Sequence, residues 1–87
     1  MQTMNKILWS KKAKKQLAKI PLNYRVAITD ATRALTNFPD AINVIALKNH
    51  RYQFRLRVGR YRVFFDHDTM IKIVAIQEVK KRDERTY

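Results

Sequence analysis

The sequence contains no cysteine, one glycine and two prolines among 87 residues. The lack of cysteine excludes a disulfide framework, a thiolate nucleophile and a cysteine-based zinc site, and it fits a reducing compartment. No apolar run approaches the roughly 20 residues of a membrane span, and the N-terminal stretch MQTMNKILWSKK lacks the order of a signal peptide. We therefore expect a cytoplasmic protein with no membrane partner.

Acidic residues are also scarce, because Lys and Arg number 19 against 7 Asp and Glu, and the formal net charge is +12. The imbalance comes in blocks. No acid precedes Asp30 and none lies between Asp40 and Asp66, while these two stretches carry seven and six cations. Nucleic acid is the leading partner for such a chain, ahead of an anionic membrane or an acidic protein.

The length predicts a single domain, residues 1–87, without a deep enclosed pocket. Residues 4–9 predict a first strand, and Ser10 is a plausible N-cap for a helix. One face of that helix is apolar at spacings of four, four and three: Trp9, Ala13, Leu17 and Ile20. The other face carries lysines that either point into solvent or contact a nucleic-acid backbone, among them Lys11, Lys12 and Lys15.

A second helix is predicted after Pro21, running to about Thr36. Its apolar positions step by four, three, four and three: Tyr24, Ile28, Ala31, Leu35 and Phe38. Residues 41–50 are interpreted as a connection, and strands are expected over 51–57, 60–66 and 70–77. The predicted fold class is α+β, in the order β-α-α-β-β-β, with an antiparallel sheet and a two-helix hairpin on one face. Ile71, Ile73 and Ala75 are expected to face the helices.

The stretch RYQFRLRVGRYRV, residues 51–63, holds five arginines and no acid. Apolar and cationic residues alternate in both halves, as in strands with one buried face. A two-residue turn at Val58 and Gly59 would pair Arg55 with Arg62 and Arg57 with Arg60. The matching apolar pairs would be Tyr52 with Phe65, Phe54 with Val63, and Leu56 with Tyr61.

Like charges opposite each other destabilise a sheet by about 0.2 to 1 kcal/mol. The arrangement becomes favourable if a phosphodiester lies across it, because guanidinium groups donate paired, charge-assisted hydrogen bonds to phosphate oxygens. The alternative is that the arginines extend into water and pair with Glu78 or Glu84.

At these residues the chain resembles the RelE/ParE superfamily of bacterial toxin–antitoxin toxins. The similarity lies in YQFRLRVGRYRVFF and in the closing segment IKIVAIQEVKKRDERTY, and it extends over the whole chain. It implies a RelE-like endoribonuclease that needs no metal or other cofactor, cuts mRNA in the ribosomal A site and is inhibited by a cognate antitoxin. A ParE-like inhibitor of DNA gyrase and a basic nucleic-acid-binding domain without toxicity are the alternatives.

The resemblance also implies a catalytic site, formed by Arg55, Arg62, either Arg82 or Lys81, and Tyr87. Gln53 departs from the family pattern, which often has lysine at this place. RNA contacts are expected over a wider surface: Gln53, Arg57, Arg60, Lys80, Lys11, Lys12 and Lys15.

Such a site uses the RNA's own 2′-hydroxyl as nucleophile, so the protein has to align the strand, neutralise the phosphorane and move two protons. Arg62 and Arg55 would supply charge and Arg82 would stabilise the phosphate or the leaving oxygen, because arginine stays protonated. Tyr87 is a candidate base or a platform for stacking, and Lys81 and Glu78 are further proton carriers. His50 and His67 are weaker catalytic candidates, and Asp66 and Asp68 are expected to serve the turn around His67.

Overall fold

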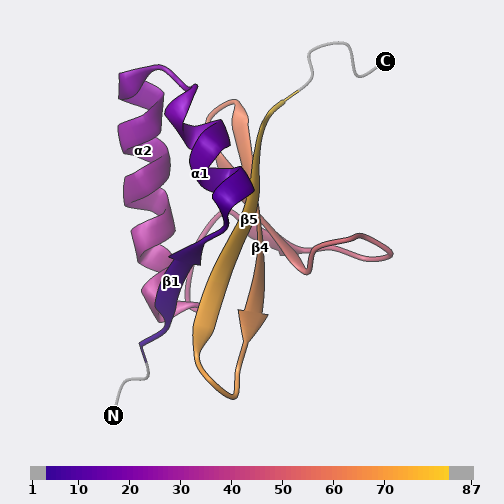
Figure 1. Ribbon diagram of the computed structural model, residues 1–87. Helices are drawn as coiled ribbons and strands as arrows, with labels where there is room; N and C mark the ends of the chain where they lie inside the picture. Colours follow the sequence, from indigo (N-terminus) through magenta and orange to yellow (C-terminus); the bar gives the residue numbers. More distant parts are fainter. Residues whose placement is uncertain (1–3, 83–87) are drawn as a thin grey trace.

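A five-stranded sheet with two helices against one face makes up the protein, as seen in a computed structural model that describes residues 4–82 (Figure 1). The strand order is β1-β5-β4-β3-β2. Neither helix of the described residues has the length and apolar composition needed to cross a membrane. The elements are β1 (Lys6–Trp9), α1 (Lys11–Ala18), α2 (Leu22–Arg33), the 3-10 turn η1 (Ala34–Asn37), β2 (Val44–Ala46), β3 (Phe54–Val58), β4 (Tyr61–Asp68) and β5 (Ile73–Lys81).

The α+β class and the placement of both helices on one face are confirmed, but the sheet is not antiparallel throughout. β1 runs parallel to β5, with Ile7 opposite Val74 and Trp9 opposite Ile76. Residues 41–50 are also more than a connection, because they contain β2, which pairs antiparallel with β3. Both differences concern short edge strands, whose partners are decided by the rest of the sheet and not by their own periodicity.

Both helices bury the faces that their spacing predicts. Ala13 is fully buried in α1, and Ile20 follows at 8% exposure. Ile28 of α2 and Leu35 of η1 are fully buried against the sheet, while Tyr24 at the start of α2 remains 43% exposed. The core therefore lies entirely between the helices and one face of the sheet, and the opposite face stays open.

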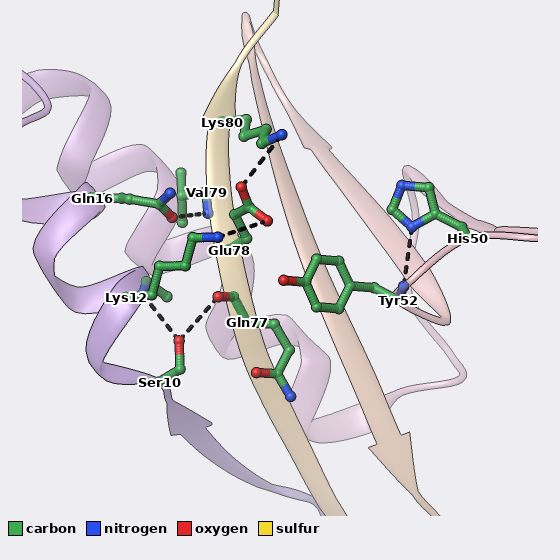
Figure 2. Close-up of polar contacts among 10 residues, drawn as sticks. Ser10, Lys12, Gln16, His50, Tyr52, Gln77, Glu78, Val79 and Lys80 are labelled. Atoms are coloured by element: carbon green, nitrogen blue, oxygen red, sulfur yellow. Dashed lines mark hydrogen bonds and ion pairs between the residues drawn. The ribbon is translucent and has the colours of Figure 1, made fainter.

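Helix α1 also covers the part of β5 that extends beyond β1. Ser10 accepts a hydrogen bond from the Ala13 backbone at 3.0 Å, which confirms it as the N-cap, and its hydroxyl donates to the Gln77 carbonyl (Figure 2). Two residues along β5, the Val79 amide donates to Oε1 of Gln16 at 2.7 Å. Side chains of α1 thus satisfy edge groups of β5 that no strand pairs.

The arginine hairpin is confirmed as a hairpin, but its register differs by two residues from the predicted one. Arg57 lies opposite Arg62, and Arg55 lies opposite Phe64. The turn is formed by Gly59 and Arg60, with Gly59 at φ 57°. Glycine at the first central position is what a type II′ turn requires, whereas the predicted turn would have placed a β-branched valine there.

The remaining predicted pairs shift in the same way: Phe54 faces Phe65, Leu56 faces Val63, and Val58 faces Tyr61. Because side chains alternate with a period of two, a shift of two residues exchanges partners but leaves every side chain of β3 and β4 on its predicted face. The arginines of both strands therefore still share one surface.

The prediction for the last strand is wrong. Val74 and Ile76 are the fully buried residues that face the helices, whereas Ile73 and Ala75 are only partly buried and Ile71 is 65% exposed. Both alternating sets of this strand are apolar, so its pattern does not distinguish the two faces.

A β-bulge in β5 then decides what the open face carries. Phe65 pairs with Ile76, but the preceding residue of β4, Phe64, pairs with Glu78, so that Gln77 is an extra residue in β5. Beyond the bulge, Val79 lies opposite the fully buried Val63 and faces the core. Glu78 is thereby placed on the open face, beside Phe64.

Replacing Gly59 by alanine is expected to lower the free energy of unfolding by about 1 to 2 kcal/mol, the ordinary cost of a left-handed conformation for a residue with a Cβ atom. An added Cβ would meet no atom within 4 Å, so the cost is conformational and not steric. In urea denaturation, the free energy of unfolding of Gly59→Asn should lie between those of the parent protein and Gly59→Ala, because asparagine tolerates this conformation better than alanine does. An alanine variant as stable as the parent protein would contradict the turn assignment.

Candidate nucleic-acid interface

The open face of the sheet is strongly cationic at the hairpin end. A hollow of about 140 Å³ lies there, and most of the side chains around it are arginines. The burial of alternate residues of β3 and β4 against the helices directs these side chains to this face, and the end of β5 closes the hollow from the other side. We call it the arginine pocket; it is lined by Arg55, Arg57, Gly59, Arg60, Tyr61, Arg62 and Arg82.

The surroundings of Arg55 disfavour the positive charge of its guanidinium group. Its Nε is buried and has no hydrogen-bond partner among residues 4–82. Burial, followed by the positive charges of Arg62, Arg57 and Arg82, lowers the pKa of the Arg55 guanidinium. A guanidinium in this condition is stabilised by an anion, which would supply both the missing acceptor and the opposing charge.

No ion pair joins a described carboxylate to Arg55, Arg62 or Arg82. Among residues 4–82, Glu78 forms its ion pairs with Lys12 at 3.5 Å and with Lys80 at 3.4 Å, not with an arginine of the hairpin. The alternative in which Glu78 pairs with the hairpin arginines is therefore wrong. Glu84, like Tyr87, lies outside the described residues.

The structure separates the two candidates from the closing segment. Arg82 lines the arginine pocket, and its amide donates to the Arg60 carbonyl at 2.6 Å. Lys81 pairs with Tyr61, whose side chain is buried on the helix side, so Lys81 belongs to the opposite face of the sheet. Only Arg82 is thus brought together with Arg55 and Arg62.

The residues expected to bind RNA more widely fall into three places. Lys80 lies opposite Arg62 on the open face, whereas Lys11 and Lys15 are exposed on α1, away from the pocket. Lys12, also on α1, reaches Glu78. Gln53 lines a separate and wider hollow of about 690 Å³ at the other end of the open face.

Gln53 and its neighbours in this second hollow are held by hydrogen bonds that stabilise the fold. The backbone amide of Gln53 donates to Oδ1 of Asp66 at 2.9 Å, and the side-chain Oε1 of Gln53 accepts from the backbone amide of His67 at 2.7 Å. His67 Nε2 contacts Asn5 at 3.0 Å, and Asp68 accepts from the Met70 amide at 2.9 Å. The predicted turn role is confirmed for Asp68, which accepts from residues of the turn at 69–72. It is wrong for Asp66, which lies with His67 inside β4 and binds Gln53 and Gln77 across the sheet.

Glu78 is the feature of the face that sequence reasoning did not place correctly. Its side chain is only 7% exposed and lies between Lys12 of α1 and Lys80, with the Tyr52 hydroxyl pointing toward it (Figure 2). Burial alone would raise the pKa of this carboxyl, but hydrogen bonding with Tyr52 and the charges of Lys80 and Lys12 outweigh burial, so the pKa is lowered. Glu78 is thus an ionised link between three elements, and a poor proton acceptor at neutral pH.

An aromatic cluster next to the pocket was also missed. His50 and Tyr52, from the segment between β2 and β3, contact Phe64 of β4 with ring centroids 5.2 and 5.8 Å apart. The predicted pairing had placed Tyr52 in the sheet opposite Phe65. The sequence did offer a signal for this cluster. His50 and Tyr52 are two positions apart, and Phe64 is an aromatic residue at a position of β4 that alternation assigns to the open face.

The family model described as "ParE toxin of type II toxin-antitoxin system, parDE" matches residues 7–85. Among curated proteins, none matches the sequence.

Solved structures share the fold at low sequence identity. The toxin–antitoxin complex RelBE2 from Mycobacterium tuberculosis is 23% identical, with a TM-score of 0.77 over 91% of this chain and 99% of that one. The archaeal RelE–RelB complex from Pyrococcus horikoshii OT3 is 22% identical, with a TM-score of 0.78 over 93% and 98%. The isolated RelE toxin of E. coli is 13% identical, with a TM-score of 0.79 over 94% and 88%.

Glu78→Gln is expected to lower the free energy of unfolding at pH 7 by about 1.5 to 3 kcal/mol, the usual contribution of hydrogen bonds to a charged group. Because the folded-state pKa of Glu78 is lowered, its stabilisation is present above the unfolded value near 4.5 and is lost as the pH falls through the folded value. Urea denaturation at a series of pH values should show that the free energies of unfolding of Glu78→Gln and the parent protein become equal in acid.

Asp30→Asn is the matched control, because the carboxylate of Asp30 is 63% exposed and forms a surface ion pair with Arg33. Such pairs contribute little to stability, so the control should stay within about 1 kcal/mol of the parent. A gap between Glu78→Gln and the parent that does not change with pH would contradict the assigned role of the carboxylate.

Proposed function

The chain belongs to the family of ParE toxins of type II toxin–antitoxin systems, within the RelE/ParE superfamily, and we propose that within this superfamily it is a RelE-like toxin that cuts mRNA in the ribosomal A site. The observation that carries this proposal is the arginine pocket. Arg55, Arg62 and Arg82 come from three different strands or strand ends and meet at one hollow, where no ion pair joins them to a described carboxylate. A scissile phosphate is the ligand that such a group of guanidinium groups binds best.

The proposed reaction needs no side-chain nucleophile and no cofactor. The 2′-hydroxyl of the RNA attacks the adjacent phosphorus, and the 5′-oxygen of the next nucleotide leaves. Arg62 and Arg55 would hold the phosphate and stabilise the charge that develops on its oxygens. Arg82, at the end of β5, would stabilise the phosphate or the leaving oxygen.

Two protons must move in this reaction, and the geometry narrows the choice of groups. Glu78 is held ionised between two lysines, and Lys81 belongs to the other face of the sheet. Tyr87 therefore remains the leading base, an assignment that rests on the family resemblance because this residue lies outside the described range. Surrounding cations would favour its phenolate form.

The proposed partners are mRNA, the ribosome and a cognate antitoxin. The solved RelE structures include complexes with RelB, and the cationic open face is a suitable surface for an acidic or amphipathic antitoxin segment. Covering this face would block the arginine pocket and so account for inhibition.

Inhibition of DNA gyrase without cleavage is the second candidate function, because the matching family model is that of ParE toxins. Induced expression separates the two. Loss of translation with cuts in the A site, mapped by primer extension on a translated message with and without ribosomes, supports the nuclease. Double-strand breaks with a DNA-damage response support the gyrase inhibitor.

Arg62→Ala is expected to abolish growth inhibition and to reduce mRNA cleavage by about 10²- to 10³-fold, the usual effect of removing one charge-stabilising donor. Its side chain lies on the open face, so the thermal transition should change little. Lys81→Ala is the matched control, because it removes the cation that directly precedes Arg82 in the chain but lies on the other face of the sheet. Full toxicity of Arg62→Ala, or equal effects of both variants, would refute the proposed site.

Tyr87→Phe removes only a hydroxyl and is expected to reduce the cleavage rate by about 10²- to 10⁴-fold if the phenol transfers a proton. Single-turnover cleavage on programmed ribosomes measures this rate. If Tyr87→Phe cleaves normally while Tyr87→Ala does not, the ring stacks and the phenol is not the base.

A further inference from the structure

The segment between β2 and β3 carries two aromatic rings onto the open face, although neither ring is part of the sheet. This segment projects from the sheet in Figure 1. His50 stacks on Phe64 with an interplanar angle of 13° and a centroid distance of 5.2 Å, while Tyr52 packs on the same ring at 5.8 Å. Phe64 is only 8% exposed beneath them, whereas His50 belongs to the exposed residues.

Both rings are held in place by polar contacts. The Tyr52 amide donates to Nδ1 of His50 at 3.0 Å, which fixes the imidazole by its edge (Figure 2). At the other end, the Tyr52 hydroxyl points to Glu78, which is itself held by Lys12 and Lys80. His50 is thus fixed through Nδ1 and through stacking on Phe64, while the residue itself remains exposed.

The aromatic cluster adjoins the arginine pocket directly. Phe64 is the cross-strand partner of Arg55, and side chains in such a pair have Cβ atoms about 5 Å apart on the same face. The Arg51 guanidinium also lies 5.9 Å from the centroid of the Tyr52 ring. Aromatic surface is therefore accompanied by guanidinium groups at Phe64 and at Tyr52, which is the composition of sites that bind single-stranded nucleic acid.

We propose that His50 and Tyr52, supported by Phe64, form a nucleobase-stacking subsite that binds one base of a single-stranded RNA whose neighbouring phosphate occupies the arginine pocket. The inference rests on the proposed RNA-cleaving function and adds a base-binding element to it. Stacking on aromatic rings is how proteins hold unpaired bases of RNA.

The test uses RNA hexanucleotides in which every 2′-hydroxyl is methylated, so that binding is measured without cleavage. One hexanucleotide has all six bases, and six others each carry a single abasic position. Fluorescence anisotropy with the full chain should show that one abasic position weakens binding by about fivefold to a hundredfold, the usual effect of losing one stacked base.

Two variants separate the ring from its hydrogen bond. His50→Asn keeps an acceptor for the Tyr52 amide but removes the ring. Its affinity for the complete RNA should therefore fall to the affinity that the parent protein has for the RNA with the sensitive abasic position. The variant should bind these two RNAs equally well. His50→Phe restores a ring without the acceptor and should keep most of the discrimination. Arg62→Ala should weaken binding of all seven RNAs by a similar factor.

Each outcome separates this inference from the function on which it rests. Equal affinity of the parent protein for all seven RNAs, together with weaker binding by Arg62→Ala, would overturn the stacking subsite alone. Full discrimination by His50→Asn would do the same. Failure of the parent protein to bind any of the RNAs would overturn both the subsite and the proposed RNA-binding function.

Discussion

The alternation of side chains along β3 and β4 is the constraint on which the arginine pocket depends. Leu56 and Val63 are buried on the helix side at 4% and 0% exposure, so their neighbours Arg55, Arg57 and Arg62 must share the other face. Fully burying one such apolar side chain stabilises the fold by about 1.5 to 3 kcal/mol, whereas a cross-strand pair of like charges costs about 0.2 to 1 kcal/mol. The core therefore holds the guanidinium groups together against their repulsion.

Those parts of the fold that depend on local periodicity could be predicted from the sequence. The apolar spacing of Ala13 and Ile28 identifies the buried helix faces, and the two-residue period of the hairpin assigns Arg55 and Arg62 to one surface whatever the register. The partners themselves could not be predicted correctly, because they depend on the turn. Gly59 accepts positive φ more readily than Val58, and this moves every pair by two residues.

Contacts between distant segments were beyond the reach of sequence patterns. Glu78 reaches the open face only because Gln77 forms a bulge, and its partner Lys12 comes from a helix 66 positions earlier in the chain. The stacking of His50 on Phe64 likewise depends on how a non-strand segment folds back. The cationic pocket follows from alternation within two strands, whereas the acidic and aromatic features beside it follow from tertiary packing.

The lengths of the two outermost strands have a consequence for how copies of the protein meet. β1 has four residues and β2 has three, and α1 occupies the rest of the β5 border through Ser10 and Gln16. A long unpaired edge strand can form hydrogen bonds with a strand of another molecule, and natural sheets limit such pairing by keeping their edge strands short. Few backbone groups at the edges of the sheet are therefore free to pair with a second copy of the protein, and the positive net charge makes two copies repel each other. Both features oppose fibril-like self-assembly.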